Sequence, residues 1–407
     1  MKKLSILFPI LACAFFMVAC ETDRDDNPFI NLSQPQQPIK LNTPTFANST
    51  YDLAYTDSII LTCTAPNYGF PATTTYVVQL SIDEDMSNPS ELTTTYHQNR
   101  MVVAGKEVAM ATTKQLINKR GLKQEDFPIE TAAYLRIRAY IAGTPETETL
   151  SNVVKLNKVK TNFALPDVEM PDSLFVIGTF NDNDWEKAVK TIQVNGSTQN
   201  HWRMVWIDNK GVRLSPVQDE PNFSDNMITP IHICTATGFN VSIDGLVTAE
   251  TPGWYIMLVE GVGNNEKRQL TLTYRFYEAN VWLIGPALNS VLGDDIKDFW
   301  TEKTLRTNYT DYVKFSVPTT MDGMFVSPAL PGDAKGDDGG LRAYVTIKWD
   351  WWQTEFMAYT NDKDRTSSKR IIKYRGNGDE VKPFVDGRKG QRVYLNFRDD
   401  TGEIKNE

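Results

Sequence analysis

Tryptophan is the residue type with the clearest chemical potential in this sequence, because its distribution is uneven. All nine tryptophans follow residue 170, and three of them fall within four positions of the stretch IKWDWWQTEF, residues 347–356. A flat indole can shield the apolar C–H face of a sugar from water, while neighbouring charged or amide side chains bond the hydroxyls. Each stacked ring would contribute on the order of 1–2 kcal/mol. The pattern therefore suggests a carbohydrate-binding surface.

The candidates for stacking are the tryptophans that a strand core would not need. If residues 347–356 form a strand, Trp349 and Trp351 share a face with Ile347, and Trp352 shares the other face with Lys348. Apolar surroundings place Trp254 and Trp282 in the core, whereas polar loops surround Trp185 and Trp300. Trp202 and Trp206 share one strand face, so one is expected in the core and the other at the surface. The predicted glycan-binding residues are Trp185, Trp202, Trp300, Arg342, Lys348, Trp349, Trp352 and Lys363.

Residues arranged for catalysis are harder to find. The three histidines, at 97, 201 and 232, are scattered, and no HExxH, GxSxG, GxxxxGK[ST] or CxxC stretch occurs. The loop GDAKGDDGG, residues 332–340, departs from the EF-hand spacing and is best explained as a glycine-rich turn. We therefore expect no catalytic residue, no metal and no cofactor. A carboxylate pair for glycoside hydrolysis is set by geometry, so spacing leaves that alternative open.

The elements that would position these residues are strands. SIILTCTA (58–65), TTTYVVQLSID (73–83), AAYLRIRAYIAG (132–143) and SNVVKLNKV (151–159) are rich in β-branched and aromatic residues, and the first three alternate apolar with polar residues. ATTKQLINKRG, residues 111–121, predicts one short helix that Gly121 ends. This combination predicts an immunoglobulin-like or fibronectin III-like sandwich over residues 44–162.

The remainder of the chain contains two segments that echo each other. SLFVIGTFNDNDW (173–185) and NVWLIGPALNSVLGDDIKDFW (280–300) both give an apolar strand, Ile-Gly, a polar loop and a tryptophan. GVRLSPV (211–217) is matched to GMFVSPAL (323–330), and GWYIMLV (253–259) loosely to QRVYLNF (391–397). We expect two tandem β-sandwich domains, residues 172–279 and 280–407, in an all-β, multidomain protein.

The N-terminus has the layout of a secretory signal. Lys2 and Lys3 precede an apolar run that ends at Ala19-Cys20, which resembles a bacterial lipobox. Residues 1–19 are therefore predicted to be a signal peptide, with Cys20 lipidated. ETDRDD follows, and residues 20–43 are predicted to be an acidic, Pro- and Gln-containing tether. The acidic start resembles the surface-export signal of Bacteroidetes lipoproteins, which implies a cell-surface protein of the outer membrane.

Net charge indicates which partners are disfavoured, and the positions of the cysteines indicate whether a disulfide is expected. The formal charge of −9 argues against nucleic acid or anionic lipid as the main partner. Cys63 and Cys234 lie in different predicted domains, so they are expected to be buried, unpaired thiols.

The order of these parts resembles one family. A lipoprotein signal, an acidic tether, an immunoglobulin-like domain with YLRIRAYIAG and SNVVKL, and tandem β-domains that open with Ile-Gly and a tryptophan loop resemble the SusE/SusF starch-binding lipoproteins, SusE more closely. That resemblance implies a non-catalytic surface protein that binds polysaccharide beside an outer-membrane glycan transporter. Its second-domain loop often reads GW, where this chain has NDNDW, so both the ligand and the number of binding domains stay open.

Two other classes of function remain as alternatives. One is a glycan-active enzyme, which would need a convergent carboxylate pair in an aromatic cleft. The other is a structural lipoprotein that docks a protein partner, which predicts buried indoles or one flat apolar patch.

Overall fold

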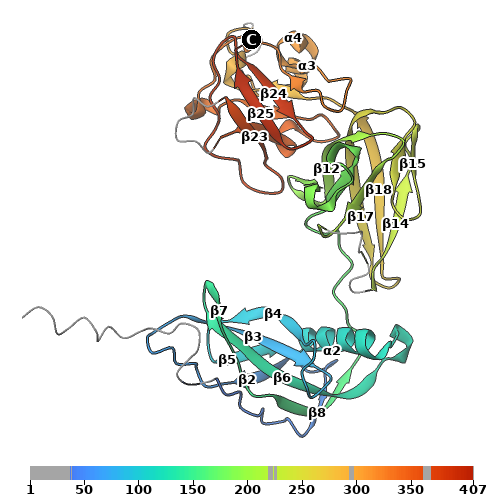
Figure 1. Cartoon of the computed structure of the whole chain (residues 1–407), viewed down its shortest axis with the longest axis vertical. Coiled ribbons are helices and arrows are strands. Elements are labelled where there is room, and N and C mark those ends of the chain that lie inside the picture. Colours follow the sequence, from blue (N-terminus) through green and yellow to red (C-terminus); the bar gives the residue numbers. More distant parts are fainter. Residues whose placement is uncertain are drawn as a thin grey trace, which may run out of the picture. The chain divides into compact units, whose positions relative to one another are not determined.

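The computed structural model describes residues 37, 39–218, 223, 227–292, 298–360 and 368–406. The chain divides into two compact units, Met1–Pro166 and Asp167–Glu407 (Figure 1). Strands dominate both units, which confirms the predicted all-β, multidomain class. Among the described residues, no helix combines the length and apolar content that crossing a bilayer requires.

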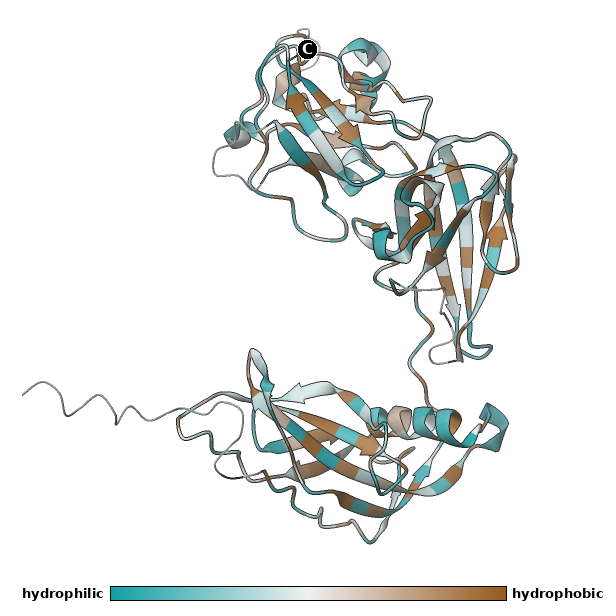
Figure 2. Ribbon diagram, in the orientation of Figure 1, coloured by the Kyte–Doolittle hydropathy of each residue, from teal (hydrophilic) through white to brown (hydrophobic). Residues whose placement is uncertain are grey.

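The first unit is a two-sheet structure with one helix. Its elements are β1 (Thr50–Asp52), β2 (Ser58–Thr62), β3 (Thr74–Ser81), β4 (Ser90–Tyr96), β5 (Arg100–Ala104), α2 (Gly105–Arg120), η1 (Gln124–Asp126), β6 (Ile129–Ile141), β7 (Thr144–Leu150) and β8 (Val154–Thr161). Six strands form one sheet in the order β1-β8-β6-β3-β4, with β7 paired to β6, and β2 pairs with β5. Apolar and polar stripes alternate along these strands, so one face of each can enter the core (Figure 2).

Two parts of this unit, the core and the helix, begin earlier in the sequence than predicted. Ile39 and Leu41, expected in the tether, are 3% and 1% exposed and belong to the core, because alternate residues of this segment face the sheets. The helix ends before Gly121 as predicted, with φ of +67° at that glycine, but begins at Gly105 rather than residue 111. A Cβ at Gly105 would lie 1.8 Å from the carbonyl oxygen of Thr56, so the chain needs glycine there.

The second unit opens with a β-sandwich. Its elements are β9 (Phe175–Gly178), η2 (Thr179–Asn181), η3 (Trp185–Lys187), β10 (Val189–Lys190), β11 (Ile192–Val194), β12 (Ser197–Ile207), β13 (Val212–Ser215), β14 (Thr229–Cys234), β15 (Phe239–Val241), β16 (Val247–Ala249), β17 (Gly253–Asn264) and β18 (Gln269–Glu278). Two five-stranded sheets, β10-β9-β13-β16-β15 and β11-β12-β17-β18-β14, enclose an apolar core.

The rest of the second unit is built on one seven-stranded sheet, β19-β21-β22-β23-β25-β24-β20. Its elements are β19 (Trp282–Ile284), η5 (Pro286–Leu288), α3 (Glu302–Asn308), α4 (Thr310–Val313), β20 (Phe325–Val326), η6 (Gly336–Asp338), β21 (Arg342–Tyr344), η7 (Trp351–Gln353), β22 (Glu355–Tyr359), β23 (Lys369–Tyr374), β24 (Arg392–Asn396) and β25 (Thr401–Lys405). Bridges from Trp282 to Lys314 and from Ser316 to Val326 link the two edge strands through one segment. The sheet therefore curls round its core instead of splitting into two.

We call the parts built on β9–β18 and on β19–β25 the middle and C-terminal modules. They share one core: Trp202 and Met204 of β12 and Ile256 of β17 pack with the apolar interior of the C-terminal module. The alternate residues Val205 and Met257 face the core of the middle module itself. Sheet β11-β12-β17 is therefore covered on both faces, which explains the nearly continuous apolar runs in these strands.

The two modules correspond to each other, although one predicted match is wrong. Arg213 of β13 pairs with Ile177 of β9, and Arg342 of β21 pairs with Ile284 of β19. GVRLS therefore corresponds to GLRAY (340–344), not to GMFVSPAL. GMFVSPAL contains β20, which pairs with β24, so it corresponds to β12, which pairs with β17. The helices α3 and α4 lie between β19 and β20, whereas no α-helix lies between β9 and β12. This insertion explains why the two sequences were matched wrongly.

Candidate functional site

The three clustered tryptophans lie in a loop, not in a strand as expected. Strand β21 ends at Tyr344, β22 begins at Glu355, and Trp351 opens the 3₁₀ helix η7 between them. The backbone N–H of Gln353 donates to the carbonyl of Asp350, and the Gln353 side chain accepts from the Asp350 N–H at 3.3 Å. The expected alternation of Trp349, Trp351 and Trp352 between two sheet faces therefore does not apply, and each ring takes its own direction from the loop.

Two indoles stack on each other at the base of this loop. The rings of Trp300 and Trp351 lie 5.1 Å apart between centroids and are inclined by only 10°. Trp300 comes from the turn before α3, where its backbone N–H donates to the Asp298 carboxylate. Gly339, with φ of +101°, makes room, because a Cβ there would lie 2.8 Å from the Trp300 ring. The pair is half-buried and packs against the shared core.

Arg342 supports these rings and has little surface to offer a ligand. Its side chain is 5% exposed, and its guanidinium lies 5.0 Å from the centroid of Trp300 and 4.3 Å from that of Phe384. It donates to Glu355 at 3.0 Å, to Glu380 at 3.1 Å and to the Gly339 carbonyl at 2.9 Å. Its burial leaves it little surface for the predicted role of binding sugar hydroxyls.

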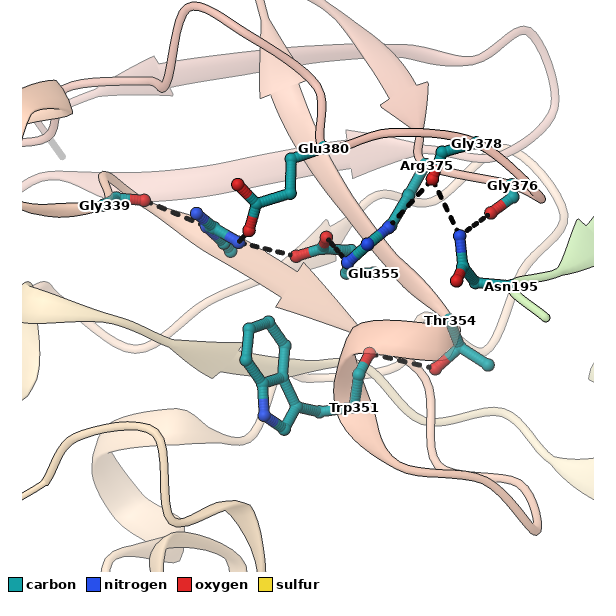
Figure 3. A network of polar contacts seen from close by, with 10 residues as sticks. Asn195, Gly339, Trp351, Thr354, Glu355, Arg375, Gly376, Gly378 and Glu380 are labelled. Atoms are coloured by element: carbon teal, nitrogen blue, oxygen red, sulfur yellow. Dashed lines mark hydrogen bonds and ion pairs between the residues drawn. The ribbon is translucent and has the colours of Figure 1, made fainter.

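Glu355 connects this arginine to a second one. Arg375 donates to the other carboxylate oxygen of Glu355 at 2.9 Å, and Figure 3 shows Glu355 held from both sides. Burial raises the pKa of Glu355, and the two arginines offset part of this effect. The Arg375 guanidinium also lies 5.4 Å from the centroid of Trp352, so the network ends beneath an indole at the surface.

The outer part of the loop presents ring surface to water. Trp352 is 37% exposed, more than any other of the nine tryptophans, all of which lie in the described residues. Trp349 is half-buried, and the Lys348 ammonium lies 4.5 Å from its ring centroid. We name Trp300, Trp349, Trp351 and Trp352 the tryptophan cluster. It places ring edges and faces beside two cationic side chains.

The remaining predicted residues lie elsewhere. Trp202 is fully buried between the modules, edge-on to Tyr374 at 5.7 Å, so it presents no face to a ligand. Trp206 and Trp254 pack edge to face, and Trp254 is in the core as predicted. Trp185 is half-buried at the start of η3, and no other described aromatic ring stacks on it. Lys363 and Cys20 lie outside the described residues.

Sequence reasoning missed the residues that hold the cluster in place. Glu355, Arg375 and Glu380 stand 13, 33 and 38 positions after Arg342, on different strands and loops, so no spacing rule groups them. The one available signal was a charged residue, Glu355, directly before the apolar run FMAY. A carboxylate at the start of a buried strand needs a cationic partner.

Two segments of the chain match family models. Residues 24–122 match the SusE outer membrane protein family, and residues 289–403 match the family described as SusF/SusE starch specific CBMs. The second match contains the whole tryptophan cluster. These matches confirm the predicted resemblance to the SusE/SusF proteins and the predicted outer-membrane location.

Individual relatives were found as well. The chain is 29% identical over 255 residues to the outer membrane protein SusF of Bacteroides thetaiotaomicron, an alignment that covers 61% of this chain and 45% of SusF. The chain thus spans less than half the length of that curated relative. The crystal structure of SusF from Bacteroides thetaiotaomicron aligns with 91% of this chain and 100% of its own, at 17% identity and a TM-score of 0.38.

Proposed function

Because this chain is SusE/SusF-like, we propose that it is a non-catalytic lipoprotein that binds starch-type polysaccharide at the cell surface. Lipid on Cys20 anchors it to the outer membrane, and the tryptophan cluster holds the polymer for a neighbouring glycan transporter. The observation that carries this proposal is the exposed Trp352, supported through Arg375 and Glu355 by the buried Arg342, inside the segment that resembles starch-specific modules.

The geometry of the cluster suits sugar faces. Trp352 and Trp349 offer ring area at the surface, and the stacked pair of Trp300 and Trp351 fixes the loop that carries them. Rings held by a buried ion-pair network lose little freedom when a ligand binds, so more of the stacking energy appears as affinity. Lys348 is exposed beside Trp349 and is the best-placed donor to sugar hydroxyls.

The carboxylates near the cluster favour binding over hydrolysis. Glu355 is 3% exposed and bonds both Arg342 and Arg375, and Glu380 bonds Arg342. A glycosidase needs one carboxyl group free to donate a proton and a second facing the sugar. Carboxylates paired with arginines instead keep neighbouring side chains in position.

The C-terminal module is the binding module in this proposal. At the position equivalent to Arg342, the middle module has Arg213, which pairs with the exposed Asp244 at 2.8 Å instead of supporting indoles. Trp185, the predicted stacking residue of this module, has no stacking partner among the described aromatic rings. One unsupported ring gives too little affinity for a polymer, so the middle module acts mainly as the base of its neighbour.

Affinity electrophoresis tests the proposal. The soluble chain that starts after Cys20 should be retarded in gels that contain amylopectin, and Trp352→Ala should weaken this retardation roughly tenfold, as the loss of one stacked ring predicts. The matched control is Tyr55→Ala in the first unit, where an aromatic ring is 87% exposed. Retardation of Trp352→Ala and Trp349→Ala equal to that of the unmodified chain would refute the assignment of the site.

The docking and enzyme alternatives give different results. A protein-docking lipoprotein would migrate unchanged in every polysaccharide gel, including amylopectin, pullulan and a mixed-linkage β-glucan. An enzyme would release reducing ends from one of these polymers. Binding to amylopectin without release of reducing ends distinguishes the proposed function from both.

A further inference from the structure

The turn between β11 and β12 reaches from the middle module to two loops of the C-terminal module. Asn195 lies in this turn and is half-buried. Its amide Nδ2 donates to the carbonyl of Gly376 at 2.9 Å and to that of Gly378 at 2.8 Å (Figure 3). Both hydrogens of the amide are therefore used on the loop that follows β23.

The backbone of the same residue binds the loop that carries the tryptophans. The Asn195 N–H donates to the Gln353 carbonyl at 3.0 Å, and the Gln353 side chain donates to the Asn195 carbonyl at 2.8 Å. Gly196 adds a bond from its N–H to the Asn377 side chain at 3.0 Å. One turn of the middle module thus connects the loop 350–354 to the loop 375–380.

These two loops carry the working parts of the candidate site. Gln353 belongs to the same 3₁₀ helix as Trp351 and Trp352. The Gly378 carbonyl accepts from Asn195 and also from the Arg375 Nε at 3.2 Å. Arg375 lies beneath Trp352 and bonds Glu355. A shift of either loop would therefore move Trp352 relative to the guanidinium that supports it.

We infer that Asn195 is a positioning residue for the glycan site, so that the site of the C-terminal module is completed by a residue of the middle module. This inference rests on the proposed function. Asn195 acts through the loops and does not touch the polymer. Its amide is suited to the task because it donates twice through Nδ2, which an aspartate of the same shape cannot do.

Asn195→Asp in the soluble chain after Cys20 tests the inference. The change keeps the size of the side chain but replaces two donors by an acceptor that faces two carbonyl oxygens. We expect binding to amylopectin to weaken about three- to tenfold, because small displacements of a preorganised site reduce its fit. Amide hydrogen exchange should accelerate at residues 350–354 and 375–378, while the thermal midpoint of unfolding falls by only a few degrees, since the shared core is kept. Asn209→Asp is the matched control, since Asn209 is exposed in a turn of the same module.

Each outcome decides the inference. Binding and exchange that equal those of the Asn209→Asp control overturn it. If Asn195→Asp fails to fold, Gln353→Glu replaces it, since this change removes only the donor to the Asn195 carbonyl; unchanged binding and exchange in that variant also overturn the inference. If the unmodified chain binds no starch, the proposed function fails, and hydrogen exchange at the two loops alone then tests whether Asn195 positions them.

Discussion

Single residues explain why the site holds its shape. Arg342 has the right chemistry for a sugar ligand, yet its side chain is buried. Its guanidinium donates to two carboxylates and a carbonyl and lies over three aromatic rings. A buried charge is tolerated only when it is paired and hydrogen-bonded, and this requirement fixes Glu355 and Glu380 around it. Trp352, the indole most exposed to a ligand, is linked to that buried network through Arg375.

His201 makes the middle module sensitive to acid. It is fully buried, its Nδ1 lies 2.7 Å from the Thr191 hydroxyl, and burial lowers the pKa of its imidazole to about 4 from 6.5. The unfolded chain therefore takes up a proton between pH 6.5 and 4 that the folded chain refuses, so stability falls as the pH falls through this range. This effect removes about 2 kcal/mol by pH 5.

His201→Gln should abolish this part of the acid sensitivity. We expect the difference in unfolding free energy between pH 8 and pH 5, measured by urea titration, to shrink by about 2 kcal/mol in the variant. Exposed His97 supplies the control, since His97→Gln should leave the difference unchanged. Equal pH dependence in both variants would show that another group dominates.

Elements determine which rings are available. A tryptophan within β12 or β17 lies in a sheet covered on both faces, whereas a tryptophan in the loop between β21 and β22 is free to face water. Trp202 is thus buried and Trp352 exposed, although each has a polar residue directly beside it in the sequence. Alternation along a strand could not separate them, because the second lies in no strand.

Trp202→Phe should separate a core role from a ligand role. The smaller ring leaves unfilled space between Phe356 and Tyr374, so the free energy of unfolding should fall by about 1–3 kcal/mol. Binding of the folded protein to amylopectin should remain within twofold of the unmodified chain. A strong loss of binding at unchanged stability would instead indicate that Trp202 contacts the ligand.

Much of the element pattern was predictable, and its gaps have physical causes. Gly121 ended the helix as expected because it adopts a positive φ that favours glycine. The predicted match between the modules failed because α3 and α4, inserted in the C-terminal module, place β21, the partner of β19, far along the chain. The site was found through its rings, but not through its supports, since pairing among Arg342, Glu355 and Arg375 depends on tertiary contacts alone.

At the scale of the whole molecule, the modules of the second unit share more than a linker. Their common core contains Trp202 and Ile256 from one module and Phe325 and Phe356 from the other. The Arg203 side chain, 1% exposed, crosses the boundary to Asp400 at 2.8 Å, and the Trp254 indole donates to the Thr320 carbonyl. Separation of the modules would expose this apolar surface and leave buried charge unpaired.

Calorimetry of the soluble chain should therefore show two unfolding transitions and not three. The middle and C-terminal modules should unfold together, because their separation would expose the core that they share, and the first unit should unfold in its own transition. Limited proteolysis offers an independent check, with cleavage expected near residues 163–167 and none between residues 278 and 282. A third transition, or a stable fragment that begins near residue 280, would contradict this expectation.

The shared face also sets rules for gene fusion and recombination. A new domain can be spliced in near Pro166, where the chain passes from one compact unit to the next. A crossover near Asn280 would instead separate Trp202 from Phe356, so that each residue would lose its packing partner and be exposed to water. Recombination can therefore exchange the two modules only as a pair, and new ligand preferences should arise by changes in the loops of that pair.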